Sequence, residues 1–423
     1  MDAALRHGRV SLTVGFLAQG VVFALLVTRI PAIQERYGMS DALLPVFLAA
    51  VPVLAGVGSV ATEGLVRRLR PSAVLRWAQP VVALALLAVG AGRDVPQLIA
   101  SLAVFGLALG ALDASMNMLG VSLQQTYGRS IMLGFHAAYS LGGILGASLA
   151  WAGAHGELPL AGLYGPVVAV LIPLALVASH WYADSASAPV PRPREPGSVD
   201  VPLTGGQDEG AARESAPSPV AMRVLMPLCL VMACVYIGDS TVANWSAKYL
   251  QDVLGSSEQL ATVPYNVYMV TTLLGRTVGD RGVRRFGAVP VVRGGTVVAA
   301  AGFAVVALAP GAAAGMAGFT LLGVGLCVIV PQAFAAAGRL FPGASDAAVA
   351  RLNIFNYVGF LVGSPLVGVL GDAWSYRGAM LVPMALVLVT LLYARSFGAE
   401  STRYGGEHER PRTADVGRGS NGL

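Results

Sequence analysis

The sequence predicts an all-α integral membrane protein with twelve transmembrane helices in two six-helix halves. Three observations predict this fold class. The composition is strongly apolar, apolar runs long enough to cross a bilayer recur along the chain, and the second half repeats features of the first. Hydrophobic residues make up 55% of the 423 residues and charged residues only 12%. Because a soluble domain carries roughly 25% charged residues, the natural solvent for this chain is a bilayer.

The twelve apolar runs are separated by breaks that contain charge, Pro or Gly, which end helices. A helix needs about 20 mainly apolar residues to cross the hydrocarbon core, where it satisfies its own backbone hydrogen bonds. The ninth and tenth runs are parted only by the short break at 309–312. The predicted spans are residues 10–29, 42–62, 73–92, 96–122, 130–154, 158–181, 222–245, 259–278, 288–309, 311–336, 350–370 and 377–396.

Two polar segments differ from the spans. Residues 182–221 contain seven prolines and mixed charge, a composition that cannot bury enough apolar surface to become ordered. We therefore expect a disordered linker there and a disordered tail of similar composition at the C-terminal end. The expected domains are an N-terminus at 1–9, a six-helix bundle at 10–181, the linker at 182–221, a second bundle at 222–396 and the tail at 397–423.

The basic residues are distributed asymmetrically about the predicted spans. With the N-terminus in the cytoplasm, both termini, the linker and the tail are cytoplasmic, as the positive-inside rule favours. In that orientation only five of the 28 Lys and Arg lie outside, namely Arg29, Arg36, Arg93, Lys248 and Arg377.

Several function classes are disfavoured. The net charge of +5 comes from short clusters between apolar runs, not from the continuous stripe that binds nucleic acid. Cys229, Cys234 and Cys327 lie within apolar runs, so we interpret them as packing residues rather than a disulfide framework or a zinc site. No phosphate-binding loop, metal-binding or serine-hydrolase motif occurs. We therefore expect no enzyme, no cofactor and no metal, and a monomer in the lipid bilayer that draws on a gradient.

The two halves share a basic loop. VRRLRPSAVLR at 66–76 aligns with VRRFGAVPVVR at 283–293, an offset of 217 that also places Glu63 on Asp280 and His136 on Asn353. Two repeated six-helix halves are the plan of many secondary transporters.

One segment carries a specific resemblance. GRTVGDRGVRRFG at 275–287 resembles the signature of the major facilitator superfamily between the eighth and ninth helices, and EGLVRRLRP at 63–71 is a weaker copy. The glycines allow close approach of helix ends, and Asp280 is expected to pair with an arginine across the gap. The alternative is that the arginines only hold the topology. The resemblance implies a cytoplasmic gate at Glu63, Arg67, Arg68, Gly275, Arg276, Gly279, Asp280, Arg281, Arg284 and Arg285.

A narrower resemblance covers most of the chain. The stretches at 28–40, 113–147 and 239–250 are similar to a bacterial branch near the fucose-permease-like transporters, most of which have no assigned substrate. This resemblance implies a location in the bacterial inner membrane. The branch has acidic residues at two positions of the seventh helix, which correspond here to Asp239 and Asn244, and the second is an amide.

Asp113 is the one charged residue between positions 96 and 128, and an ionisable group at the bilayer centre costs ~3 kcal/mol. Gly106, Gly110, Asp113 and Asn117 are spaced 4, 3 and 4 apart, so they share one helical face. We predict Asp113, His136 and Asp239 as proton-coupling residues. Two alternatives remain for Asp113 and His136: proton exchange during transport, or a buried pair that only fixes two helices.

Amide and aromatic residues within the spans are the candidates for solute binding, since amides both donate and accept hydrogen bonds. The alternative is a structural role. Each residue would then form an interhelical hydrogen bond worth about 0.6 kcal/mol, and Trp245 would anchor its helix at the membrane interface. No dense set of aromatics and charges, as at a sugar site, is evident. The candidates are Gln19, Asn117, Tyr139, Asn244, Trp245, Asn266, Tyr268, Gln332, Asn353, Asn356 and Tyr357.

The predicted function is secondary active transport of a small solute by alternating access, with protons as the coupling ion. Two directions remain open, uptake by proton symport and export of a drug or metabolite by proton antiport. SLGGILGAS at 140–148 lacks the Gly-Pro pair of many drug exporters, which disfavours a typical drug antiporter. A third alternative is a transporter-like receptor that senses a ligand without moving it.

Overall fold

The computed structural model describes residues 3–39, 44–182, 220–257, 260, 263–341 and 343–398, and all regular structure in these ranges is helical. The first half contains α1 (Ala3–Thr28), α2 (Ile30–Arg36), α3 (Leu44–Leu65), α4 (Pro71–Ala91), α5 (Val95–Tyr127), α6 (Met132–His155), α7 (Leu160–Ala178) and the short η1 (Ser179–Trp181). The second half contains α8 (Met222–Lys248), η3 (Tyr249–Val253), α10 (Val263–Phe286), α11 (Ala288–Leu308), α12 (Ala312–Leu326), α13 (Ile329–Leu340), α14 (Ser345–Ala373), α15 (Tyr376–Ala379), α16 (Leu381–Tyr393) and η4 (Ala394–Gly398).

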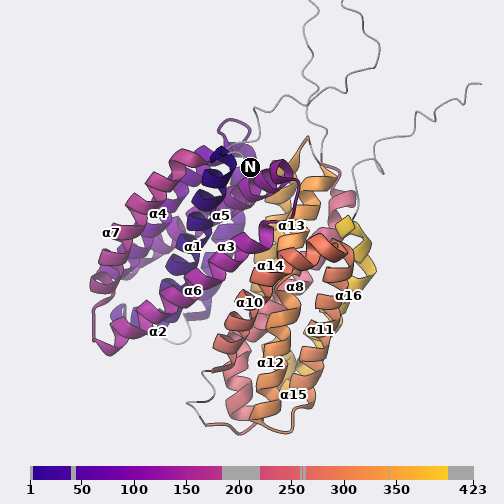
Figure 1. Ribbon diagram of the computed structural model, residues 1–423. Helices are drawn as coiled ribbons and strands as arrows, with labels where there is room; N and C mark the ends of the chain where they lie inside the picture. The colour runs from indigo at the N-terminus through magenta and orange to yellow at the C-terminus, as the bar shows by residue number, and fades with distance from the viewer. Residues whose placement is uncertain are drawn as a thin grey trace, which may run out of the picture.

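The helices form two bundles that have the same internal packing. α1 packs on α6 as α8 packs on α14, α3 on α5 as α10 on α12, and α4 on α7 as α11 on α16. The bundles contact each other through α3 with α14 and through the equivalent pair α10 with α6. In Figure 1 they come together near the label N and diverge toward the opposite end. The fold is therefore the twofold repeat that the sequence predicts.

Equivalent glycines in the two halves lie where the backbone of a neighbouring helix comes very close. Gly142 packs against the backbone carbonyl of Leu17 in α1, and Gly359, 217 residues later, packs against that of Ala233 in α8. Any larger residue at either position would overlap the neighbouring helix, since small residues are what allow such approach in a membrane. The offset found in the sequence thus marks equivalent helix crossings.

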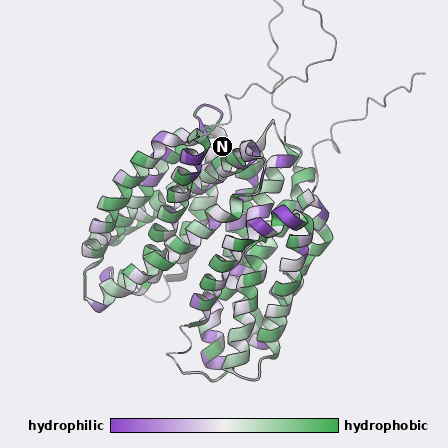
Figure 2. Ribbon diagram, viewed as in Figure 1, coloured by the Kyte–Doolittle hydropathy of each residue, from purple (hydrophilic) through white to green (hydrophobic). Residues whose placement is uncertain are grey.

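All twelve predicted spans correspond to helices, with end positions that differ by up to eight residues. Within the described ranges, ten helical spans are long and apolar enough to cross a membrane. α3 has a shorter apolar segment, Ala49–Leu65, and α10 is polar because residues such as Arg276 and Asp280 face the protein interior. Figure 2 shows apolar residues along the middle of both bundles, with hydrophilic ones mainly near the ends.

Three expected boundaries need correction. α1 begins at Ala3, inside the predicted N-terminal segment, and η4 continues to Gly398, two residues into the predicted tail, where Phe397 is buried. The predicted span 311–336 is two helices, because Pro331 has no N–H to donate to the carbonyl of Cys327. The expected linker and tail lie almost wholly at 183–219 and 399–423, outside the described residues.

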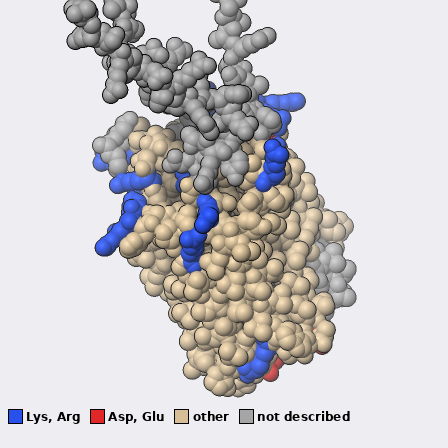
Figure 3. Space-filling model, turned by 90° about the vertical axis from the view of Figure 1, so that its right-hand side faces the viewer, with Lys and Arg blue, Asp and Glu red and all other residues tan. Residues whose placement is uncertain are grey.

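Charged side chains are unevenly placed along the molecule. Figure 3 shows that Lys and Arg on the visible face lie mainly toward the end where the bundles meet, with few farther along the molecule. At the opposite end Lys248 pairs with Asp252 at 2.8 Å, with both side chains about half exposed.

The packing of Gly142 predicts the effect of an alanine at this position, and the neighbouring Gly143 provides the control. Gly142→Ala should lower the free energy of unfolding by about 1–3 kcal/mol, because the new methyl group overlaps the carbonyl of Leu17. Gly143→Ala, next along the helix, faces open space and should leave stability unchanged or raise it by up to ~1 kcal/mol. Thermal unfolding of the two purified variants checks this, and equal effects would contradict the register of α6 on α1.

Candidate functional site

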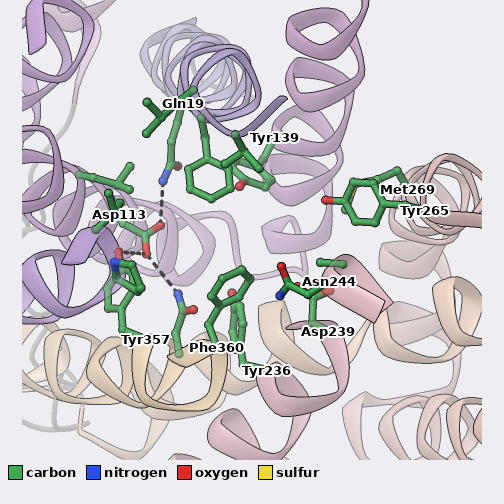
Figure 4. Close-up of a pocket in the computed structure, with 18 of the residues that line it drawn as sticks. Gln19, Asp113, Tyr139, Tyr236, Asp239, Asn244, Tyr265, Met269, Tyr357 and Phe360 are labelled. Atoms are coloured by element: carbon green, nitrogen blue, oxygen red, sulfur yellow. Dashed lines mark hydrogen bonds between the residues drawn. The ribbon is translucent and has the colours of Figure 1, made fainter. Parts of the chain in front are cut away.

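A cavity of about 480 Å³ lies between the two bundles, with walls from α1, α3, α5 and α6 on one side and α8, α10, α13 and α14 on the other. It extends from Arg276 and His136 to Thr28, Ile33 and Met39, near the end where the bundles diverge. Figure 4 shows the polar side chains of the two bundles facing each other across it.

Asp113 of α5 binds both bundles through its two carboxylate oxygens. Oδ1 accepts from Nε2 of Gln19 at 3.2 Å and Nδ2 of Asn117 at 3.3 Å, both in the first bundle. Oδ2 accepts from the hydroxyl of Tyr357 at 3.1 Å and Nδ2 of Asn356 at 3.5 Å, both on α14 of the second bundle. Figure 4 shows Gln19 and Tyr357 approaching the carboxylate from opposite sides. The carboxylate is thus a hydrogen-bonded bridge between the two bundles.

Asp239 of α8 has a different environment. Its Oδ1 accepts a hydrogen bond from the hydroxyl of Tyr268 on α10, a residue of the same bundle. Asn244, one and a half turns along α8, also lines the cavity, and its Nδ2 donates to the backbone carbonyl of Ser240 at 2.9 Å. Asp239 therefore makes no bridge between bundles comparable to that of Asp113.

His136 lines the cavity but has no hydrogen bond to Asp113, and this corrects the expected pairing of the two. Its ring lies 5.3 Å from that of Phe16 and 6.2 Å from that of Phe334, centroid to centroid. The side chain is buried, and Nε2 has no partner among the described residues. The amides and Tyr357 occupy the positions around Asp113 where an imidazole was expected.

Arg276 of α10 closes the inner end of the cavity. Its Nη1 donates to Oγ of Ser140 at 2.6 Å and to the carbonyl of His136 at 3.2 Å, both on α6 of the other bundle. Its Nε donates to the carbonyl of Cys327 at 3.4 Å. That carbonyl is free because Pro331 cannot donate to it, so the break between α12 and α13 helps to hold the guanidinium in place.

Beyond Arg276 the two bundles are joined at the face where they meet. Asp280 accepts from the hydroxyl of Ser130 at 2.6 Å and from the backbone N–H of Gly134 at 3.0 Å, in the first turn of α6. A carboxylate is stabilised at a helix N-terminus by the free N–H groups and the helix dipole. The arginine expected as the partner of Asp280 is therefore replaced by a helix end. Arg284 adds a bond from Nη1 to the carbonyl of Ser130 at 2.9 Å.

The repeat-related carboxylate, Glu63 of α3, makes the arginine pair instead. Arg351 of α14 donates to Glu63 from Nη2 at 2.7 Å and from Nε at 3.1 Å, and its Nη1 binds the carbonyl of Val220 at 3.0 Å. Arg351 stands 217 residues after Gly134, so both carboxylates reach equivalent positions on the opposite bundle. Planar, charge-assisted pairs of this kind are stronger than neutral hydrogen bonds.

The remaining predicted gate residues divide into two groups. Gly275 packs on Sγ of Cys327 and Gly279 on the side chain of Leu133, which are close approaches of the expected kind. Arg67 makes only an exposed pair with Glu63 at 3.4 Å. The others are exposed, and topology remains a sufficient role for them: Arg68, Arg281 and Arg285.

The structure brings most of the predicted solute-binding residues together and separates five. The cavity is lined by Gln19, Tyr139, Asn244, Tyr268, Asn356 and Tyr357. Trp245 donates to the carbonyl of Ser364, and its ring is tilted against that of Tyr376 with the centroids 5.4 Å apart. Gln332 donates to the hydroxyl of Ser130 at 3.4 Å, beyond the inner end of the cavity. Asn353 contacts Ser59, Asn117 binds only its neighbour Asp113, and Asn266 is not among the lining residues.

Sequence analysis did not identify several of the aromatic rings that line the cavity. The missed rings are Phe16, Phe23, Tyr236 and Phe360. The signal was helical spacing: Phe16 and Phe23 stand three before and four after Gln19, and Tyr236 stands three before Asp239.

Known proteins match this chain along most of its length. The family model described as Major Facilitator Superfamily matches residues 228–416. An uncharacterized MFS-type transporter of Yersinia pestis is 28% identical over 392 residues, which cover 92% of this chain and 95% of that protein. Among solved structures, FucP in the outward conformation has a TM-score of 0.73 at 15% identity, covering 92% and 98% of the two chains. The human organic anion transporter MFSD10 has a TM-score of 0.75 at 16% identity, covering 93% and 100%.

The pair of Glu63 and Arg351 should hold the bundles together. Glu63→Gln removes a charge-assisted pair worth about 1.5–3 kcal/mol, so the separated state at this face should gain roughly tenfold or more in population. Spin labels at the exposed positions Thr126 and Phe286, with the native cysteines replaced by alanine, report the distance by double electron–electron resonance. Arg67→Gln is the control, since its exposed pair with Glu63 is worth little. Identical distance distributions in both variants would contradict the assignment.

Proposed function

We propose that the chain is a proton-coupled secondary transporter of the major facilitator superfamily, in which Asp113 is the coupling carboxylate. Proteins of this superfamily are multi-span membrane transporters of small molecules. The finer proposal places the chain in the bacterial inner membrane as a monomer, since the walls of the cavity come from one chain. Both termini are then cytoplasmic, as the placement of Lys and Arg supports, and the cavity faces outward.

The observation that carries the proposal is the division of the Asp113 carboxylate between bundles. An ionised carboxylate only accepts hydrogen bonds, so the hydroxyl of Tyr357 and the amide of Asn356 both donate to Oδ2. A proton on Oδ2 turns that oxygen into a donor and leaves these groups facing a donor. Hydrogen bonds to a charged group are worth about 1.5–3 kcal/mol each. Proton binding therefore weakens the contact of α5 with α14 at the level of the cavity.

In this proposal, alternating access depends on two sets of contacts between the bundles. One is the hydrogen bonding of Asp113 to α14, and the other is the set of contacts at the closed face, where the bundles meet beyond Arg276. In the outward state the cytoplasmic end is held by Asp280 on the N-terminus of α6, Glu63 on Arg351 and Arg276 on Ser140. A ligand shifts such an equilibrium only by its difference in affinity for the two states. Protonation of Asp113 and occupation of the cavity supply that difference, and the bundles rock about the central site.

Symport and antiport differ in the direction in which the proton moves relative to the solute. Asp239 and Asp113 lie on different bundles and have different partners, so solute and proton need not compete for one carboxylate. This separation favours symport. The receptor alternative requires binding without flux, which a vesicle assay separates directly.

Asp113→Asn should abolish substrate-dependent proton movement, because an amide cannot take up the transported proton. The purified protein is reconstituted in proteoliposomes, and internal pH is followed while sugars, amino acids and cationic amines are added. Internal acidification on solute addition indicates symport and alkalinisation indicates antiport. Tyr357→Phe, which removes one donor to Oδ2, should slow coupled flux by roughly tenfold.

Asp252→Asn is the matched control, since Asp252 is exposed and bonded only to Lys248. It should transport like the unmodified protein. Solute flux with equal proton movement in the Asp113→Asn protein would contradict the proposal, and flux with none in either protein would indicate a facilitator.

A further inference from the structure

The two carboxylates of the cavity differ in how completely their oxygens are bonded. Asp113 has four donors, two on each oxygen. Asp239 has one donor, the hydroxyl of Tyr268 on Oδ1, and its Oδ2 has no hydrogen-bond partner in the part of the chain that the structure describes. An unpaired carboxylate oxygen in a largely apolar cavity is costly, so a positive partner that enters the cavity would be bound strongly there.

Aromatic side chains line the cavity near Asp239. Tyr236 lies one turn before Asp239 on α8, and Tyr265 lies on α10 with its ring stacked 6.2 Å from that of Tyr268. Figure 4 shows Tyr236 and Asp239 on the same side of the cavity, with Tyr265 facing them. The face of an aromatic ring attracts a cation within about 6 Å, and quaternary and methylated ammonium groups are recognised by such surroundings.

His136 is another residue of the cavity lining with a polar atom that is unpaired in the described part of the chain. The His136 side chain is 8% exposed and lines the cavity, and its Nε2 lacks a hydrogen-bond partner among the described residues. Nε2 itself has almost no accessible surface, so a solute would contact this atom only after the ring moves.

The one basic side chain with a fixed charge in the lining is already engaged. Arg276 donates from Nη1 to α6 and from Nε to the carbonyl of Cys327 at the inner end. Arg276 also interacts electrostatically with Asp239, but the described lining contains two carboxylates and one guanidinium, which is an excess of negative charge when Asp113 is ionised.

From these contacts we propose that the solute is a small organic monocation, whose ammonium group binds Oδ2 of Asp239 between Tyr236 and Tyr265. This inference rests on the proposed function, since it assigns the chemical class of the transported solute. Asp239 then binds the solute while Asp113 takes the proton.

Two cations and their neutral isosteres test the charge requirement. Choline is compared with 3,3-dimethylbutan-1-ol, and tyramine with 4-propylphenol, which replace the ammonium group by carbon. Binding to the full-length protein in nanodiscs is measured from the rise in Tm, since a ligand that binds only the folded state stabilises it. We expect the cations to raise Tm and the isosteres to have no effect. Equal shifts within both pairs, or no shift with either cation, would overturn the inference.

Variants of Asp239 and Tyr265 then test whether these residues bind the cation. Asp239→Asn should weaken tyramine binding roughly tenfold to a hundredfold, the loss expected for a hydrogen bond between charged groups, and Asp239→Glu should restore selectivity for the cation. Asp252→Asn, outside the cavity, is the matched control and should bind normally. If Asp239→Asn does not fold, Tyr265→Ala should weaken cation binding by about two- to thirtyfold without affecting the isosteres. Unchanged cation binding in Asp239→Asn would exclude the site.

The Asp113→Asn protein, measured in parallel, separates this inference from the proposed function. Selective cation binding that Asp113→Asn retains, with proton movement lost, supports both. Proton movement that depends on Asp113 but no preference for cations overturns only the solute class. Selective cation binding with proton movement that does not depend on Asp113 overturns only the coupling role.

Discussion

A carboxylate within a membrane protein must find donors among its neighbours, and Asp113 takes them from both halves of the molecule. Gln19 and Asn117 hold one oxygen in the first bundle, while Tyr357 and Asn356 hold the other from the second. The rest of the site is arranged around this constraint. The bridge fixes the distance between α5 and α14, and the cavity lies beside it between the bundles. Any change in the charge of Asp113 therefore acts on the relative position of the two halves.

At the closed face, each half binds the other through an equivalent carboxylate, but the groups that bind the two carboxylates differ. Asp280 and Glu63, the equivalent carboxylates of the two halves, each contact the opposite half, Asp280 at the first turn of α6 and Glu63 on α14. One meets a backbone N–H of Gly134 and the other the guanidinium of Arg351, which stands at the equivalent position. A helix N-terminus and an arginine both supply positive potential and hydrogen-bond donors. The repeat thus preserves the electrostatic role of the contact although the partner groups differ.

Local sequence patterns predicted the parts of the fold that depend on local properties. Apolar runs gave the twelve spans, and the 217-residue offset gave the repeat, which the equivalent packing of Gly142 and Gly359 confirms. Asp113 could be singled out because it is alone in an apolar run. Its partners could not, since Tyr357 and Asn356 are more than 240 residues away and reach it only through the docking of α14 on α5.

Two other features of the site, the partner of Asp280 and the aromatic lining, also depend on contacts between distant segments. The partner of Asp280 is a backbone N–H, a group that nearly every residue has and that the sequence therefore cannot single out. The expected arginine partner was wrong for this reason. The aromatic lining is spread over several helices as single rings, and it becomes dense only when Phe16, Tyr236 and Phe360 are brought to one cavity. Helical spacing around Gln19 and Asp239 contained part of that information. The break at Pro331 was also readable, but that it frees a carbonyl for Arg276 depends on the packing of α10.

The central claim is that a proton on Asp113 weakens the bridge to α14, and infrared difference spectroscopy tests it at the carboxyl group itself. Acidification of the reconstituted protein should produce a carboxyl C=O band that is absent from Asp113→Asn and shifted in Tyr357→Phe, where one hydrogen bond to the group is missing. That result would place the proton on the bridging carboxylate. An acidification spectrum that is the same in all three proteins would contradict the account.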